Sequence, residues 1–157
     1  MTAVSAESQF YEYANQLAGS ASSVHHRWSE DRLTISFRKI NDEGFDIEVS
    51  YDPISKELEI QTDRGCHDHF HAEKFESFPA ALACVFGLVR DLLSRNMRIE
   101  ETQANGKPRK WELQANINGK WVTESTTGLF IWNVFGSKSM AKYSNDALPP
   151  RERCHDA

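Results

Sequence analysis

The feature that most constrains this chain is a change in the spacing of its apolar residues. Between Arg32 and Thr62 apolar and polar side chains alternate, which predicts strands with one buried face. Between Ser77 and Ser94 apolar residues recur at steps of three and four, which predicts an amphipathic helix. After Asn96 the alternation returns. The chain is therefore expected to combine one long helix with antiparallel strands before and after it.

The long helix is expected over residues 77–94. Ser77 is suited to cap its first turn, where Pro79 is tolerated, and Asn96 can close the other end in a left-handed conformation. Gly87 lies in the middle, where glycine costs about 1 kcal/mol relative to alanine. We therefore expect close packing at this position, against a strand or against the first helix.

A shorter helix is expected near the start of the chain, from about Ser5 to Ala18, with Gly19 as its stop. The segment before Gly19 lacks the basic start and the apolar stretch of a secretory signal. The longest apolar run is too short to cross a bilayer. The expected protein is cytoplasmic and makes no membrane contact.

Three strands, arranged as a meander, are predicted between the two helices, and three or four follow the second helix. Asn105-Gly106 and Asn118-Gly119 each lie between alternating runs, which is a strong signal of a hairpin. The run 129–135 is apolar on both faces, so it is expected to be a central strand or an interface. The predicted fold is α+β in the order α-βββ-α-βββ(β). A mainly antiparallel sheet of about six or seven strands would pack against the long helix, with the N-terminal helix alongside.

Length and composition favour a single domain. A chain of 157 residues with 39% hydrophobic residues can bury a core without disulfides or a structural metal. We expect one domain over residues 1–148 and a polar, disordered tail over 149–157. The three cysteines form an odd set without paired spacing, and Cys84 has the position of a small core residue. The others are Cys66 and Cys154.

Charge is unevenly distributed along the chain, whose formal net charge is −5. Residues 1–63 contain 12 acidic and 5 basic residues, whereas residues 64–157 contain 11 acidic and 13 basic ones. The first segment thus carries −7 and the second +2. An excess of carboxylates argues against binding to nucleic-acid phosphates and favours a basic partner.

The predicted meander places carboxylates on its outward face. Hydrophobic alternation implies that Phe37 pairs with Phe45 and that Val49 pairs with Ile60. Arg32 is the main base that offsets the negative charge of this face, and an acidic surface of this kind suits a basic partner. The plainer interpretation is a solvated sheet face that keeps the protein soluble. The outward carboxylates are Asp46, Glu48, Glu59 and Asp63.

Three histidines stand at alternate positions before the long helix: His67, His69 and His71. In an extended segment they would share one face, at a spacing that suits zinc or another transition metal. A tetrahedral site would need further ligands, and neither Cys154-His155 nor His25-His26 has diagnostic spacing. The alternative is a polar loop that caps the following helix, with no cofactor.

The same histidines support an alternative function, a metal-dependent or histidine-dependent hydrolytic enzyme. Asp68 would orient a histidine that acts as the base. No phosphate-binding loop, nucleophile elbow or H-E-x-x-H motif accompanies them. Cys66 and His67 are neighbours and would point to opposite faces of a strand. We therefore assign no catalytic residue.

Aromatic residues gather after the second helix and include Trp111, Trp121, Phe130, Trp132 and Phe135. In a sheet covered by helices such residues belong to the core, whereas at an open surface they anchor partners. Of these, Phe130 and Trp132 lie in the two-faced run and are the expected contacts with a partner, including a second copy of the chain.

A short acidic α+β chain without a catalytic motif, ending in polar residues, loosely resembles bacterial immunity proteins that neutralise toxins and small products of mobile gene cassettes. The resemblance covers architecture and charge, and no residue roles follow from it. It implies a protein that binds and blocks another protein, and many nuclease toxins are basic. The expected function is therefore a small soluble binding protein that neutralises a basic protein through its acidic sheet face.

Overall fold

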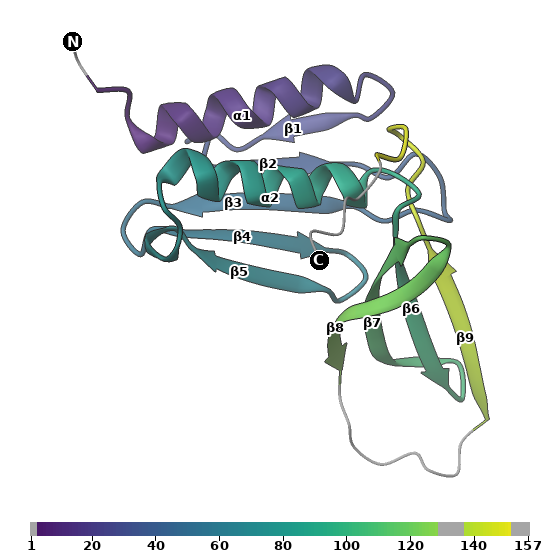
Figure 1. Ribbon diagram of the computed structural model, residues 1–157. Helices are drawn as coiled ribbons and strands as arrows, with labels where there is room; N and C mark the ends of the chain where they lie inside the picture. Colours follow the sequence, from purple (N-terminus) through teal and green to yellow (C-terminus); the bar gives the residue numbers. More distant parts are fainter. Residues whose placement is uncertain (1–2, 129–136, 152–157) are drawn as a thin grey trace.

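Figure 1 shows the computed structural model of the chain, of which residues 3–128 and 137–151 are described. Two helices cover one face of a five-stranded antiparallel sheet, and a four-stranded antiparallel sheet lies at one end of this layer. The strand orders are β1-β2-β3-β4-β5 and β8-β7-β6-β9. The α+β class is confirmed. The prediction of a single sheet of six or seven strands is wrong, because the strands after the second helix form a separate sheet.

The five-stranded sheet is a meander with two more strands than predicted. The predicted pairing of Val49 with Ile60 is confirmed, but Phe37 pairs with Ile47 rather than with Phe45. The two additional strands, at the sheet edges, show little apolar alternation. The strands are β1 (His26–Trp28), β2 (Thr34–Phe37), β3 (Ile47–Asp52), β4 (Glu57–Thr62) and β5 (His67–His71).

Helix α1 (Ala6–Ser20) begins where the sequence predicts and ends two residues later. The Ser5 side chain accepts a hydrogen bond from the backbone N–H of Ser8, which satisfies one of the free donors of the first turn. Its buried side chains, Phe10 and Leu17 among them, belong to the main core.

Helix α2 (Phe78–Leu92) follows a short 3-10 turn, η1 (Ala72–Lys74). The predicted cap is confirmed, because the Ser77 hydroxyl accepts a hydrogen bond from Ala80 N at 3.2 Å. The prediction that Asn96 closes the helix in a left-handed conformation is wrong. The C-cap residue is Leu93, which has a right-handed conformation, and Asn96 is not among the described residues with positive φ.

Gly87 is explained by the C-terminal segment rather than by a strand or α1. Arg151 Nη2 donates to Gly87 O at 3.1 Å, and a Cβ on residue 87 would lie 3.2 Å from that nitrogen. The same guanidinium donates to both carboxylate oxygens of Asp91, at 2.8 and 3.0 Å. Of the predicted tail, residues 149–151 are thus placed beside α2, while 152–157 lie outside the described residues.

The four-stranded sheet contains both predicted hairpins. Asn105 and Gly106 have φ of 52° and 75°, and Asn118 and Gly119 have φ of 52° and 79°, as a tight hairpin turn requires. The predicted strand 129–135 lies outside the described residues. The strands are β6 (Met97–Ala104), β7 (Lys107–Ile117), β8 (Lys120–Gly128) and β9 (Lys138–Tyr143).

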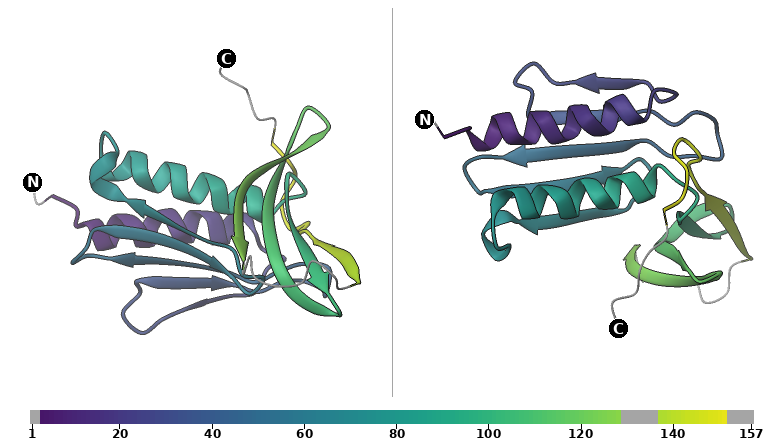
Figure 2. Two further views of the ribbon diagram at one scale, coloured as in Figure 1. Left: turned by 90° about the horizontal axis from the view of Figure 1, so that it is seen from below. Right: turned by 45° about the horizontal axis from the view of Figure 1, so that its top comes forward.

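The second sheet crosses the end of the first (Figure 2) and shares its core. Met97, Ile99 and Ala115 are fully buried and belong to the same cluster as the helices. Trp111 lies over Gly65 in the β4–β5 turn, where a Cβ would come within 2.7 Å of the indole. Gly65 also has φ of 79°, so its lack of a side chain serves both the turn and the contact.

A buried amide joins the two sheets and α2. Asn145 Oδ1 accepts from Phe45 N at 3.2 Å, and Nδ2 donates to Phe45 O and to Leu92 O, both at 3.1 Å. A Cβ on Gly44 would lie 2.4 Å from Asn145 Oδ1, so only glycine fits beside the amide. This contact fixes the β2–β3 loop against the segment that follows β9.

The Asn145→Ala variant should be less stable than the parent by about 2–4 kcal/mol, because three buried backbone groups lose their partner. Urea unfolding followed by circular dichroism measures the difference. Asn41→Ala is the matched control, since the Asn41 side chain bonds Glu43 N in an exposed turn, and its cost should stay below about 1 kcal/mol. Equal losses in the two variants would contradict the role given to Asn145.

Candidate functional site

The face of the five-stranded sheet opposite the helices carries polar side chains, and we call it the open face. Figure 2 shows both helices on the other side of this sheet. Cross-strand register places Glu48 between Ser36 and Gln61, and Glu59 between Ser50 and His69. Glu48 and Glu59 therefore lie on the two central strands of the acidic surface, as the sequence predicts.

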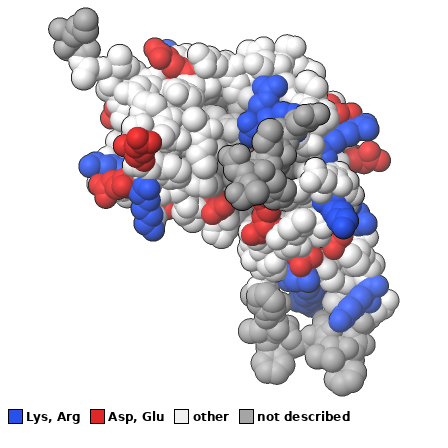
Figure 3. All heavy atoms as spheres, viewed as in Figure 1, with Lys and Arg blue, Asp and Glu red and all other residues white. Residues whose placement is uncertain are grey.

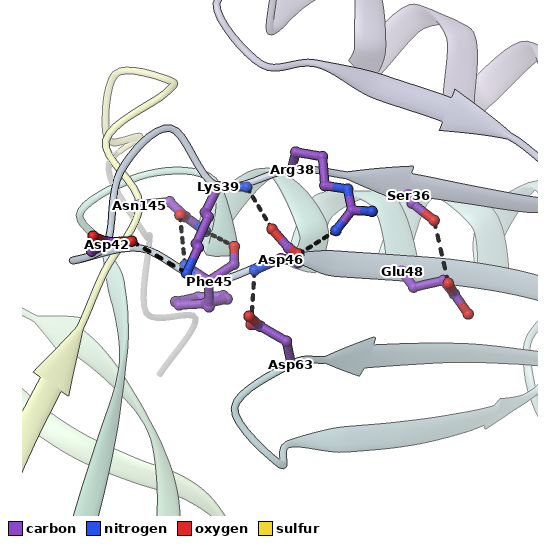
Figure 4. Close-up of polar contacts among 9 residues, drawn as sticks. All are labelled: Ser36, Arg38, Lys39, Asp42, Phe45, Asp46, Glu48, Asp63 and Asn145. Carbon is purple, nitrogen blue, oxygen red and sulfur yellow. Dashed lines mark hydrogen bonds and ion pairs between the residues drawn. The ribbon is translucent and has the colours of Figure 1, made fainter.

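The other two predicted carboxylates hold the ends of strands together. Asp46 accepts hydrogen bonds from Arg38 Nη1 and from Lys39 N, both at 2.8 Å, and Asp63 accepts one from Asp46 N at 2.9 Å. Figure 4 shows these contacts in a row beside Glu48, which accepts a bond from Ser36 Oγ at 3.2 Å. Asp46 and Asp63 thus have a structural role that sequence alternation does not reveal. With their neighbours they line a depression of about 260 Å³.

The basic residue that offsets the negative charge of the open face is not the predicted Arg32. Arg32 lies in the β1–β2 turn with φ of 59°, and its guanidinium stands 5.1 Å from the centre of the Tyr11 ring on α1. Arg38 instead pairs with Asp46. Neither Glu48 nor Glu59 has a Lys or Arg partner among the described residues.

The three predicted histidines lie together on strand β5. The prediction of an extended segment is therefore confirmed, and the alternative prediction of a loop is wrong. Alternation places their side chains on the open face, where they oppose Gln61, Glu59 and Glu57 in turn. His69 Nδ1 contacts Glu57 Oε1, and the His67 and His69 rings are perpendicular with centroids 5.3 Å apart. The cap of the following helix comes from Ser77 instead. The histidines are His67, His69 and His71.

In residues 3–128 and 137–151, no group of three or more His, Cys, Asp or Glu side chains is arranged to hold a metal ion. His26 lies on β1, at the opposite edge of the sheet from β5. Cys154 and His155 lie outside the described residues. The metal-dependent form of the hydrolytic alternative therefore has no assembled metal site in the part of the chain that the structure describes, and the histidine-dependent form stays a prediction.

The two described cysteines lie in different environments. Cys66 is buried, and burial raises the pKa of its thiol to about 11. Cys84, predicted to be a core residue, is exposed. On α2 the buried positions Ala81, Leu82 and Val85 face the sheet, and residue 84 points away from them.

A second concavity of about 500 Å³ lies between the two sheets and was not predicted. Its walls come from the β2–β3 loop, the α2–β6 turn, β6, β8 and the segment around the end of β9. Because these segments are distant in sequence, no local sequence pattern predicts the cleft. Its lining includes Arg95, Arg98, Trp121, Lys142 and Ser144.

Comparison with protein-family models, with curated proteins and with solved structures finds no match to this chain. None of the described helices is long and apolar enough to span a membrane.

We expect Cys84 to react rapidly with Ellman's reagent at pH 8 in a Cys154→Ser background, and Cys66 to react only after unfolding. A thiol whose pKa is raised to about 11 stays protonated there, and the thiolate is the nucleophile. Because the folded state holds this proton more tightly, the stability it contributes is lost as pH rises from about 8.5 toward 11. Rapid labelling of both thiols in the folded protein would contradict this assignment.

Proposed function

We propose that this protein binds a basic protein partner on its open face and thereby blocks that partner. The observation that supports the proposal is the position of Glu48 and Glu59. They lie on adjacent strands, on the side of the sheet away from both helices, and no Lys or Arg of the described residues neutralises them. Unpaired carboxylates on an accessible surface are free to meet cations from another molecule.

The charge of the whole open face supports the same partner. Its strands and their ends present six carboxylates against the two guanidinium groups of Arg27 and Arg38. The opposite face, seen in Figure 3, has few charged side chains across the helices, and most of its charges lie toward the margins. Negative potential is therefore concentrated on one side, which steers a basic partner there. The six are Asp46, Glu48, Asp52, Glu57, Glu59 and Asp63.

Other partners suit this surface less well. Nucleic-acid phosphates and anionic lipid headgroups would be repelled by the carboxylates of the open face. A homodimer through residues 129–135, with Phe130 and Trp132 in contact, stays a prediction because that segment lies outside the described residues. The open face thus favours a protein with clustered Lys or Arg.

Octalysine is a suitable probe of the open face, because it presents only the charge that the proposed partner would carry. At about 0.1 M salt, where the Debye length is about 10 Å, it should shift the amide NMR resonances of β3 and β4 more than those of α1 and α2. Glu48→Lys/Glu59→Lys should weaken its binding by roughly tenfold or more, since the substitution exchanges attraction for repulsion.

The control is Glu12→Lys/Glu30→Lys, which makes the same change in net charge on α1 and in the turn after β1. It should bind octalysine within about twofold of the parent, because distant exposed charges are screened. If the two double variants lose affinity equally, binding follows net charge and the open face is not the docking surface. Proteins captured by the parent from a lysate count as partners only when Glu48→Lys/Glu59→Lys fails to retain them.

A further inference from the structure

We propose that the cleft between the two sheets binds a small molecule bearing a phosphate group. This inference is independent of the open face and of its partner. The cleft measures about 500 Å³, which is within the usual size of small-molecule sites. It collects cationic side chains from three separate segments of a chain whose net charge is negative.

Arg98 is the best-positioned of these cations. Its Nε donates to Gln114 Oε1 at 2.7 Å, and its guanidinium lies 4.0 Å from the centre of the Trp121 ring. The nearest carboxylate oxygen, on Glu100, is 3.8 Å from Nη2, beyond hydrogen-bond distance. The Nη groups therefore have no hydrogen bond among the described residues while the plane of the fork is fixed. A fixed guanidinium fork matches the oxygens of a phosphate.

Lys142 adds a second cation to the cleft, whereas Arg95 is paired with a carboxylate. Lys142 lies on β9 opposite Glu100 and on the same face of the sheet as Arg98, and its Nζ is 4.0 Å from Glu100 Oε2. Arg95, in the turn between α2 and β6, pairs with Asp146 at 2.8 Å. This pair is neutral as a whole, so Arg98 and Lys142 are the cations left to meet a phosphate; Glu100 Oε2 lies within 4.0 Å of both, and Glu43 is also in the lining. Figure 3 shows Lys and Arg side chains where the two sheets meet.

The other residues that line the cleft indicate what the ligand carries besides its phosphate group. Asn41 and Ser144 provide polar groups, and Trp121 and Ile40 provide apolar surface. Ile40 is 52% exposed, so the entrance is open to a molecule larger than inorganic phosphate. A phosphomonoester of a small polyhydroxylated molecule fits this combination, since its phosphate would meet Arg98 and Lys142 while hydroxyl groups meet the amide and the hydroxyl.

Isothermal titration with ribose 5-phosphate tests the proposal, with ribose as the uncharged comparison. We expect saturable binding of the phosphate ester, and affinity for ribose at least about tenfold lower, because charge-assisted hydrogen bonds are lost. Absence of saturable binding to ribose 5-phosphate, or equal affinity for ribose, would overturn the proposal.

Arg98→Gln should weaken binding of ribose 5-phosphate at least about tenfold, and Lys142→Gln should weaken it severalfold. Because the Lys142 side chain is half-exposed, Lys142→Gln is expected to fold, and it still tests the proposal if Arg98→Gln fails to fold. Arg27→Gln, on β1, is the matched control and should bind like the parent. Unchanged affinity in Lys142→Gln and in a folded Arg98→Gln would place the ligand elsewhere. Glu48→Lys/Glu59→Lys should leave this affinity unchanged, which separates the cleft from the open face.

Discussion

The placement of the two sheets depends on the buried amide of Asn145. Its hydrogen bonds join Phe45, which is 100 residues away, to Leu92 at the end of α2. Buried backbone groups must be paired, so this side chain completes the bonding of a loop that has no strand partner there. The segments that it brings together, around the β2–β3 loop and the end of β9, are also the walls of the inter-sheet cleft. The contact therefore helps to hold together the segments that form the cleft.

The C-terminal segment reinforces the same arrangement. Ala147 N and Leu148 N both donate to Leu93 O, and Arg151 reaches back to Asp91. Asp91 is 2% exposed, and the hydrogen bond to its carboxylate raises the pKa of Arg151, whose side chain is half-exposed. Residues that composition assigns to a polar tail thus help to fix the end of α2, next to the second sheet.

Local chemistry allowed much of the fold to be predicted. Both helix caps and both Asn-Gly turns depend on residues a few positions apart, and the pairing of Val49 with Ile60 follows from one buried face on each strand. The edge strand β5 was considered only as an alternative to a loop and was not counted among the predicted strands, because its only half-buried side chain is Phe70. Cys84 was misplaced because its apolar character was taken as a sign of burial, whereas the buried positions Ala81, Leu82 and Val85 leave residues 83 and 84 on the outer face of α2.

The sequence by itself determined the α+β class, the two helices with their N-terminal caps, the hairpin turns and the acidity of the first sheet, since each follows from periodicity, composition or short-range bonding. Only the tertiary structure decided that the strands form two sheets and that Arg98 lies over Trp121 beside a cleft. It also decided that Asp46 and Asp63 hold strand ends, while Glu48 and Glu59 have no Lys or Arg partner among the described residues. The physical reason is that strand pairing and side-chain contacts between distant segments depend on the packing of the whole core, which no local pattern encodes.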